Sequence, residues 1–347
     1  MRVDLVVRAL RTQGGTERFA LGLSRHLVAA GDAVTAWVLE PGERPRGVEI
    51  RRLPGPPVRG RLPRMLRLAW GGRSVAQRGG GVSIGLLRAP GFDLWRAGGG
   101  CHAEWLRVGA QRLDAASRIE LDLDRRAAHH AGRIIVNSQM AARGLVQEYG
   151  VSEDSIRLVR NGVDLDRFAP RPQVAPPIPR PAVAFLGHGW QRKGLATALE
   201  ALALSPGVHL GVMGSDRHSG RFRRLAEALE VSDRVHFLGP STDPAKALPG
   251  YDAFMLPTRY DPSANATLEA LACGVPVVTS ARDGASEILP DPAWCVSDPC
   301  DAAGFADALA RILLQRGARD AARSAAARWP AEEAFAATRT FALEHAG

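Results

Sequence analysis

The chain alternates apolar segments of strand length with longer segments of helical periodicity, and this alternation restricts its fold more than any other feature. Val3–Ala9 is an apolar run that is followed by the glycine pair Gly14-Gly15. Residues 16–30 then carry apolar side chains at helical spacing, and residues 33–39 form a second apolar run. A strand, a helix and a strand joined in this order form a parallel sheet covered by helices. The sequence therefore predicts an α/β protein.

A proline-rich stretch divides this alternation into two runs. Half of the positions from Pro170 to Pro181 are proline, so this stretch can continue neither a helix nor a central strand and is expected to be a stiff linker. The 347 residues also exceed the usual size of one core, which favours two domains. The predicted parts are a first domain over 1–165, a linker over 166–180, a second domain over 181–329, and a C-terminal helix over 330–347 that packs back on the first domain.

The composition describes a basic globular protein. The formal net charge is +9, and almost all of the positive charge is arginine, because Lys193 and Lys246 are the only lysines. Arginine suits phosphates, so the charge is consistent with an anionic partner such as a nucleotide or an acidic lipid surface. High-GC coding, which also favours arginine, explains the same balance. The charge is spread along the chain without an aromatic platform, and we therefore expect no nucleic-acid partner.

Targeting and metal signals are weak. The four cysteines have no zinc-site spacing and are expected to be free thiols. The N-terminus is expected to be a strand and no signal peptide, and no apolar run reaches the length of a membrane span. We expect a cytoplasmic protein, with peripheral contact at the cytoplasmic face of the inner membrane.

The stretch from Pro257 to Ser280 is expected to carry a small-molecule site. Asp261 lies in a turn, a helix of small residues follows, and Gly274 closes that helix ahead of an apolar strand. Small residues at a helix start let a ligand approach the backbone N–H groups. Asp261 and Glu269 could then border one ligand from different heights. The alternative is a capping aspartate and a surface glutamate.

Two other segments are candidates for phosphate binding. Arg192 and Lys193 follow the strand-ending glycines of residues 187–189 and are predicted to open a helix that runs to about Leu204. Cations at a helix start are unfavourable unless an anion is bound there, so we expect a phosphate at this point. The Gly14-Gly15 pair permits a phosphate or sugar at the next helix, or is a plain tight turn.

Three features of the first half allow more than one interpretation. Residues 59–78 mix arginines with apolar side chains, as in a segment that lies on an acidic membrane or meets a phosphorylated acceptor, or as in a helix with a solvated arginine face. His102 follows a triple glycine in an open loop, where catalytic groups often lie, although a lone histidine is more often structural. Two D-x-D triplets, Asp122–Asp124 and Asp164–Asp166, are not interpreted as metal ligands.

With these segments in place, the chain resembles the retaining nucleotide-sugar glycosyltransferases of family four. It is most similar to the branch that contains the lipopolysaccharide core heptose I α-1,3-glucosyltransferases. The resemblance implies the GT-B fold, two Rossmann-like parallel-sheet domains that face each other across a cleft. The matching pieces are Gly14-Gly15, GFDLWRAGGGCHAEWL, IIVNSQMAARGL, RNGVDLDRF, GWQRKGL and YDPSANATLEALACGVPVVTS.

The resemblance also implies roles for individual residues. Arg192 and Lys193 would hold the donor diphosphate, Glu269 the nucleotide ribose, and Gly15 the donor phosphate or sugar. Asp261 stands where the family usually has a glutamate that touches the donor sugar, and an acidic residue found near Gly99 in some relatives is missing. The expected catalytic residues are Arg192, Lys193, Asp261 and His102. The expected donor-binding residues are Gly15, Gly187, Arg192, Lys193, Asn265, Ala266, Thr267 and Glu269.

The implied reaction moves a sugar from a nucleotide-diphosphate sugar, with a UDP-sugar expected, to a hydroxyl of a glycan or glycolipid acceptor, without a metal or other cofactor. Lipopolysaccharide or other cell-envelope polysaccharide synthesis is the expected context. Departure of the diphosphate builds negative charge that two fixed cations can stabilise. The alternatives are a non-catalytic basic sugar-binding or membrane-binding relative and a nicotinamide-dependent oxidoreductase. The second lacks the glycine fingerprint of dinucleotide sites.

Overall fold

The computed structural model describes residues 1–108, 113–171 and 174–344. The chain forms two compact units, Met1–Arg160 with the segment from Ala331 onward, and Asn161–Pro330. Pro172 and Gln173 of the predicted linker lie outside the described residues, as do residues 345–347 of the predicted C-terminal helix. Among the described residues, no helix is both long and apolar enough to cross a membrane.

The first unit is built on a parallel seven-stranded sheet in the order β3-β2-β1-β4-β5-β6-β7. Its inner strand β1 is buried at the four apolar positions Val3, Leu5, Val6 and Val7, as expected for a strand covered on both faces. The strands are β1 (Arg2–Val7), β2 (Ala33–Val38), β3 (Val48–Arg52), β4 (Val82–Gly85), β5 (Leu94–Arg96), β6 (Arg133–Val136) and β7 (Ile156–Leu158). The helices are α1 (Gly15–Ala29), α2 (Arg61–Ala76), α3 (His102–Val108), α4 (Ala115–His130), α5 (Gln139–Tyr149) and α13 (Ala331–Leu343).

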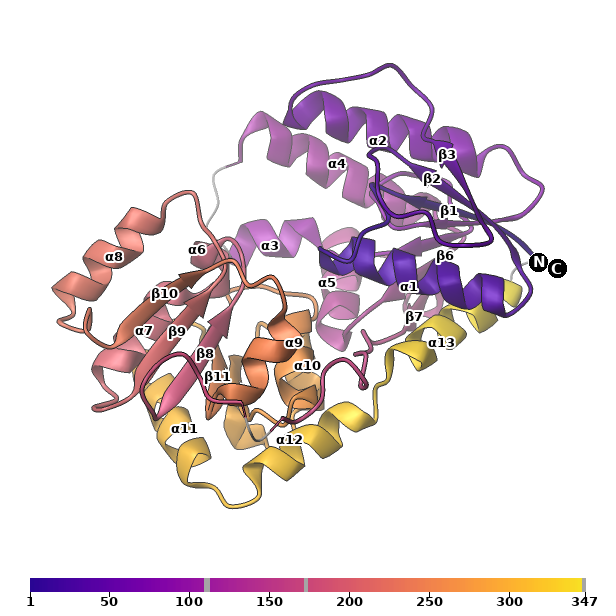
Figure 1. Cartoon of the computed structure of the whole chain (residues 1–347). Helices are drawn as coiled ribbons and strands as arrows, with labels where there is room; N and C mark the ends of the chain where they lie inside the picture. Colours follow the sequence, from indigo (N-terminus) through magenta and orange to yellow (C-terminus); the bar gives the residue numbers. More distant parts are fainter. Residues whose placement is uncertain (109–112, 172–173, 345–347) are drawn as a thin grey trace. The chain divides into compact units, whose positions relative to one another are not determined.

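Helix α13, from the end of the chain, belongs to this first unit. Figure 1 shows it in yellow beside α1 in indigo, and the rings of Phe19 and Phe335 meet edge to face with centroids 5.3 Å apart. Arg339 adds a polar tie, because its Nε donates to Asp32 at 2.7 Å. Burying an aromatic side chain contributes about 1.5–3 kcal/mol, so the ring contact is the larger part of this attachment.

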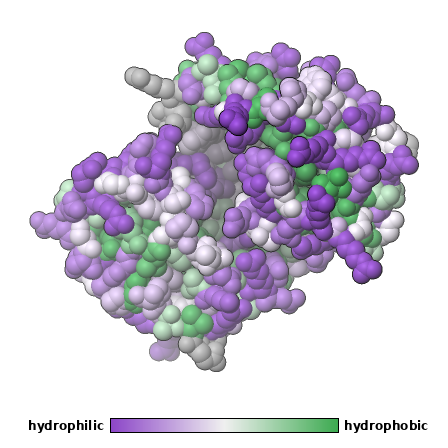
Figure 2. Space-filling view, turned by 45° about the horizontal axis from the view of Figure 1, so that its top comes forward, coloured by the Kyte–Doolittle hydropathy of each residue, from purple (hydrophilic) through white to green (hydrophobic). Residues whose placement is uncertain are grey.

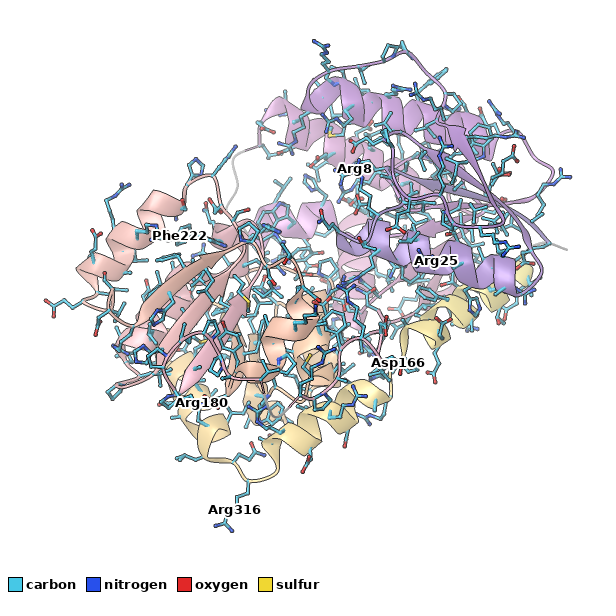
Figure 3. All side chains as sticks on the ribbon, viewed as in Figure 1. Arg8, Arg25, Asp166, Arg180, Phe222 and Arg316 are labelled. Atoms are coloured by element: carbon cyan, nitrogen blue, oxygen red, sulfur yellow. The ribbon has the colours of Figure 1, made fainter. Side chains whose placement is uncertain are left out.

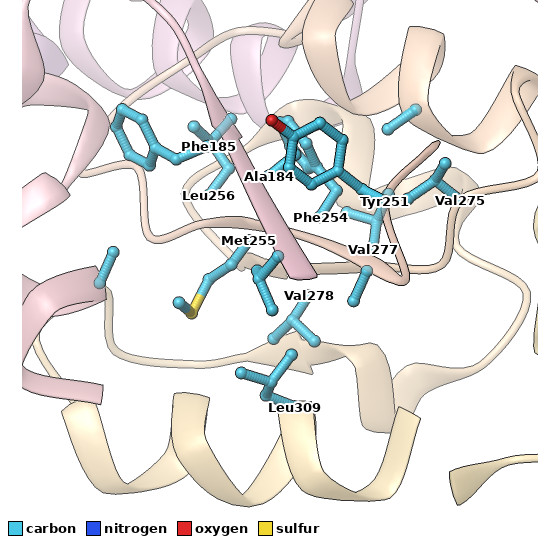
Figure 4. Packing of buried hydrophobic residues seen from close by; sticks show 14 of the residues in the cluster. Ala184, Phe185, Tyr251, Phe254, Met255, Leu256, Val275, Val277, Val278 and Leu309 are labelled. Atoms are coloured by element: carbon cyan, nitrogen blue, oxygen red, sulfur yellow. The ribbon is translucent and has the colours of Figure 1, made fainter. Parts of the chain in front are cut away.

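The second unit holds a parallel six-stranded sheet in the order β10-β9-β8-β11-β12-β13. Figure 4 shows its core, where Phe185, Phe254 and Met255 lie among aliphatic side chains. The strands are β8 (Ala182–Leu186), β9 (His209–Met213), β10 (Val235–Gly239), β11 (Ala253–Leu256), β12 (Val277–Ser280) and β13 (Cys295–Val296). The helices are α6 (Trp190–Lys193), α7 (Leu195–Ala203), α8 (Ser219–Ala228), α9 (Pro244–Ala247), α10 (Asn265–Ala272), α11 (Ala302–Leu314) and α12 (Ala318–Ala327).

The surface is mostly polar. On the face drawn in Figure 2, hydrophilic side chains dominate and hydrophobic ones occur in small groups. Many of the polar side chains are arginines that extend into solvent, such as Arg316 in the turn between α11 and α12 (Figure 3). The arginines and the lysine that are buried and held in place by partners are of greater interest for function than those that extend into solvent.

Candidate active site

The topology of the second unit marks one edge of its sheet as a ligand site. The chain proceeds from β8 outward to β9 and β10, then returns to place β11 on the other side of β8. In open parallel sheets, ligands bind beyond the carboxyl ends of the strands where the order reverses in this way. Gly187 follows β8 and Pro257 follows β11, so the loops predicted to carry the site both begin at this point.

Three predicted residues meet here in one charge cluster. Lys193 Nζ lies 2.6 Å from Oδ2 of Asp261, and Arg192 Nη1 lies 2.7 Å from the same oxygen. Arg192 Nη1 also donates to the carbonyl oxygen of Tyr260 at 3.1 Å. The Lys193 side chain is 9% exposed, whereas that of Arg192 is 35% exposed. The cluster therefore has a buried ammonium at its base and a guanidinium that reaches solvent.

The predicted placement of Arg192 and Lys193 at a helix start is wrong. They end the single-turn helix α6, and Gly194 interrupts the backbone with a φ of 78° before α7 begins at Leu195. A Cβ at Gly194 would collide with the carbonyl oxygen of Pro257, so the break is fixed by close backbone packing. Cations at a helix C-terminus are favourable, and the unfavourable dipole argument no longer applies. Asp261 compensates their charge instead.

Gly187 provides the path for the lysine side chain. A Cβ at this position would lie 3.2 Å from Cγ and 3.3 Å from Cε of Lys193. The absence of a side chain at Gly187 therefore lets the lysine stem run over the end of β8 and bring its ammonium to Asp261.

A second buried acid supports this loop, and sequence reasoning missed it. Asp283 is fully buried beyond the end of β12. Its Oδ1 accepts from the backbone N–H of Ala264 at 2.9 Å, and its Oδ2 accepts from the Thr267 hydroxyl at 2.7 Å. Asp283 thus fixes the start of α10. The available signal was an Asp-Gly pair directly after a buried strand.

Burial and charge affect the two acids in opposite directions. Burial alone would raise the pKa of Asp261, but the charges and hydrogen bonds of Lys193 and Arg192 outweigh it and lower this pKa to about 2. Burial, and then the negative charge of Asp261, raise the pKa of Asp283 to about 6. Above that pH the two cations of the cluster face two ionised carboxylates.

The other predicted donor-binding residues of this unit lie on the first turns of α10. Asn265 Oδ1 accepts from the side-chain amide of Asn161 at 3.0 Å, and Glu269 lies one turn further on and is 5% exposed. Ala266 is partly exposed between them, and Thr267 is held by Asp283. Ala264 occupies the N-cap position of α10, and its side chain makes no capping hydrogen bond. Asn161 was not among the predicted site residues, but it contacts the N-terminal end of this helix.

Gly15 and His102 belong to the first unit. Gly15 begins α1 after Gly14, whose φ is 88°. His102 begins α3, is 6% exposed, and places Nε2 3.2 Å from a carboxylate oxygen of Glu120. Burial, and then the charge of Arg88, lower the pKa of His102, so it is neutral at pH 7. The described residues contain no group of three or more His, Cys, Asp and Glu side chains placed to hold a metal ion.

Comparison with known proteins assigns each half of the chain to a glycosyltransferase family. Residues 13–167 match the family described as Glycosyltransferase Family 4, and residues 166–329 match Glycosyl transferases group 1. The chain is 32% identical to the lipopolysaccharide core biosynthesis glycosyltransferase LpsE of Rhizobium meliloti (strain 1021) over 167 residues, 47% of this chain and 49% of that protein. It is 30% identical to a D-inositol 3-phosphate glycosyltransferase of Mycolicibacterium smegmatis over 204 residues, 55% of this chain and 47% of that protein. The chain spans about half the length of these curated relatives.

Solved structures show the fold. WaaG, a glycosyltransferase involved in lipopolysaccharide biosynthesis, superposes with a TM-score of 0.79 at 20% identity over 97% of this chain and 98% of WaaG. HepE of Anabaena, solved with UDP and glucose, superposes with a TM-score of 0.75 at 14% identity over 99% of each chain. The predicted α/β fold with two parallel sheets of the GT-B type is confirmed. With its two halves matched in turn, the chain belongs to the group 1 and family 4 glycosyltransferases of the GT-B fold.

Proposed function

We propose that the protein is a retaining glycosyltransferase that moves a sugar from a nucleotide-diphosphate sugar to a hydroxyl of a glycan or glycolipid. The cluster of Arg192, Lys193 and Asp261 is the observation that carries this proposal. It holds two cations at the switch point of the sheet within the matched group 1 segment. HepE, a structural neighbour, has been solved with UDP-glucose, which supports a UDP-sugar as donor.

The cluster suits a departing diphosphate. An ammonium has three N–H donors, and the bond to Asp261 uses one of those on Lys193, so others can reach phosphate oxygens. Because Lys193 is buried, its charge acts in a medium of low dielectric, where it stabilises developing negative charge more strongly than in water. Asp261 holds the ammonium in place before the donor arrives and borders the donor sugar.

The remaining donor contacts are assigned to the first turns of α10 and to residues of the first unit. Asn265 and Ala266 would present backbone N–H groups to the nucleotide, and Glu269 would accept from the ribose hydroxyls, whereas Thr267, which is fully buried and donates its N–H to the carbonyl oxygen of Ala264, would support this turn from behind. Gly15 would approach the donor through its backbone, and His102 would act at the acceptor side. A neutral imidazole at pH 7 can accept a proton, which is consistent with that role.

The acceptor is proposed to be a cell-envelope glycan. This rests on the partial likeness to LpsE and on the fold shared with WaaG, both of which are named for lipopolysaccharide synthesis. Helix α2 provides a surface for such an acceptor, because Leu66 and Trp70 are 46% and 57% exposed among its arginines. We propose that this helix contacts acidic lipid. Co-sedimentation with vesicles of phosphatidylglycerol, which should weaken in Trp70→Ala and in high salt, tests this contact.

Donor hydrolysis without acceptor tests the proposed function. We expect one nucleotide sugar in a thermal-shift screen to raise the melting temperature and then to be hydrolysed slowly by the wild-type protein and not by Lys193→Ala. Binding without hydrolysis or transfer would support the alternative of a non-catalytic sugar-binding relative. Stabilisation by NAD and by no nucleotide sugar would support an oxidoreductase and contradict the proposal.

A further inference from the structure

The first unit contains a cavity of about 200 Å³ that the donor chemistry does not use. This is about six to seven times the volume that one water occupies in the liquid, so the cavity has room for a small polar group and part of a sugar ring. Its walls come from α2, α4, the start of α1, strand β5 and the segments that follow β4 and β5. The apolar side includes Leu68 and Leu123, and the polar side includes Arg88, Arg96, Glu120 and Asp124.

Arg88 is held in this cavity by a fully buried acid. Asp124 Oδ1 accepts from Arg88 Nε at 2.7 Å, while Oδ2 accepts from the backbone N–H of His102 at 2.8 Å and from the Tyr149 hydroxyl at 2.9 Å. The bond through Nε fixes the plane of the guanidinium and does not use its two terminal nitrogens. Arg88 lines the cavity, and its side chain remains 32% exposed.

Arg96 brings a second guanidinium to the same wall. It is 5% exposed, and its guanidinium carbon lies 3.6 Å from the centre of the Phe19 ring. Burial lowers its pKa to about 9, so it is still cationic at neutral pH.

The triple glycine leaves space for both arginine head groups. A Cβ at Gly98 would collide with Nη1 of Arg96, and a Cβ at Gly99 would lie 3.4 Å from Nη2 of Arg88. A side chain at Gly98 would displace the Arg96 guanidinium, whereas one at Gly99 would only contact that of Arg88. Glu120 is directed at other partners, since one of its oxygens lies 3.2 Å from His102 Nε2 and the other 3.2 Å from Arg61. The wall near the glycines is therefore the basic side of the cavity.

We propose that this basic wall binds an oxyanion, a phosphate or carboxylate group carried by the acceptor, and that Arg88 is a specificity-determining residue. Guanidinium groups match such anions with two parallel hydrogen bonds, and a prepositioned arginine loses little freedom on binding. The inference rests on the proposed function and adds to it the chemical class of the acceptor.

Calorimetric titration with three monosaccharides tests the inference without any turnover. Glucose 6-phosphate, glucuronate and glucose are the probes, and the proteins are wild type, Arg88→Gln, Arg88→Lys and Arg126→Gln. Arg126 is a matched control, because it lies on α4 with its own acid Asp122 at 2.8 Å and is 58% exposed. We expect an anionic probe to bind the wild type and Arg126→Gln at least about tenfold more tightly than glucose, and Arg88→Gln to lose this preference.

Each outcome is informative. Arg88→Lys keeps the charge but not the planar guanidinium with its two parallel donors, and it should keep part of the preference for an anion. The anionic probe that binds more tightly identifies the recognised group as phosphate or carboxylate. Equal affinity for glucose and both anions in the wild type, or a preference retained in Arg88→Gln, overturns the inference, as does the absence of binding by either anion. UDP-glucose titrated into the same four proteins tests the proposed function separately, because Arg88 lies outside the donor cluster.

Discussion

Each unit pairs an arginine with a buried aspartate, Arg192 with Asp261 and Arg88 with Asp124, but the two clusters differ in charge. Asp261 receives two cations, Arg192 and Lys193, on a single oxygen. Asp124 pairs with one cation, Arg88, through Oδ1, and its Oδ2 accepts hydrogen bonds from a backbone N–H and a tyrosine hydroxyl. Among these groups the first cluster has one more cation than carboxylates and the second has one of each, and the nearby Asp283 adds a second carboxylate beside the first cluster only above about pH 6.

This difference in charge corresponds to two different roles of an arginine–aspartate pair. A surplus of cations at a switch point stabilises a bound dianion, and Asp261 keeps them in place until it arrives. A balanced pair positions one guanidinium and ties the His102 helix to α4. We therefore expect changes in the first cluster to act on the donor and changes in the second to act on stability and the acceptor.

The largest expected effect is that of Lys193→Ala. Removing the buried ammonium should lower the rate of transfer or donor hydrolysis by about two to three orders of magnitude, as for other charge-stabilising donors. Lys246→Ala is the matched control, because Lys246 is the only other lysine and its side chain is 75% exposed. Steady-state rates with a saturating donor measure both. An unchanged rate in Lys193→Ala would remove this residue from the mechanism.

Asp261→Asn should next separate stability from donor binding. Without the carboxylate, two cations remain close together, and we expect the free energy of unfolding to fall by about 2 kcal/mol, a value reduced from that of a fully buried pair because Arg192 is partly exposed. Bound UDP should restore much of this loss, since its phosphates replace the missing charge. Thermal unfolding with and without UDP measures the effect. A smaller UDP-induced shift than in the wild type would contradict it.

Asp124→Asn should act on the balanced cluster alone. An amide offers one acceptor oxygen where the carboxylate offers two, so one donor loses its partner at a loss of about 1–2 kcal/mol. We expect a melting temperature several degrees lower and an unchanged affinity for UDP-glucose. A donor affinity that falls as much as in a variant of the Asp261 cluster would show that the two clusters do not act separately.

A further expected effect, confined to a narrow pH range, is a change in pH dependence at Asp283. Its pKa is raised from 3.8 to about 6 on folding, so the folded protein keeps a proton that the unfolded chain has released. Its contribution to the free energy of unfolding is therefore fully present below about pH 4 and is lost as the pH rises through about 6. Denaturant titrations between pH 4 and 7 give the free energy of unfolding at each pH. This contribution should make the free energy fall with rising pH in the wild type and should be missing in Asp283→Asn. Equal dependence of the unfolding free energy on pH in the two proteins would contradict the raised pKa of Asp283.

Local signals mark several elements in both units. Ala182–Leu186 and Ala253–Leu256 are apolar runs bounded by turn residues, and both are strands with these bounds. Helix α5 of the first unit begins after Ser138, whose side chain caps it, and ends at Gly150 in the left-handed conformation, so local signals mark both of its ends. The α/β class followed from such segments.

What the sequence could not predict depended on contacts between distant segments. The break at Gly194 is set by the backbone of Pro257, and the roles of Asp124 and Asp283 are set by partners on other elements. The predicted phosphate residues Arg192 and Lys193 do meet Asp261, but the dipole argument that selected them was wrong. The sequence motifs predicted which residues take part in the candidate site, but they did not predict how these residues are arranged in space.

Isothermal titration of UDP-glucose into the wild type, Lys193→Ala and Lys246→Ala tests the central claim most directly. If the Lys193 cluster binds the donor diphosphate, the wild type and Lys246→Ala should bind with equal affinity and Lys193→Ala at least about tenfold more weakly. Equal affinity in all three proteins would contradict the account.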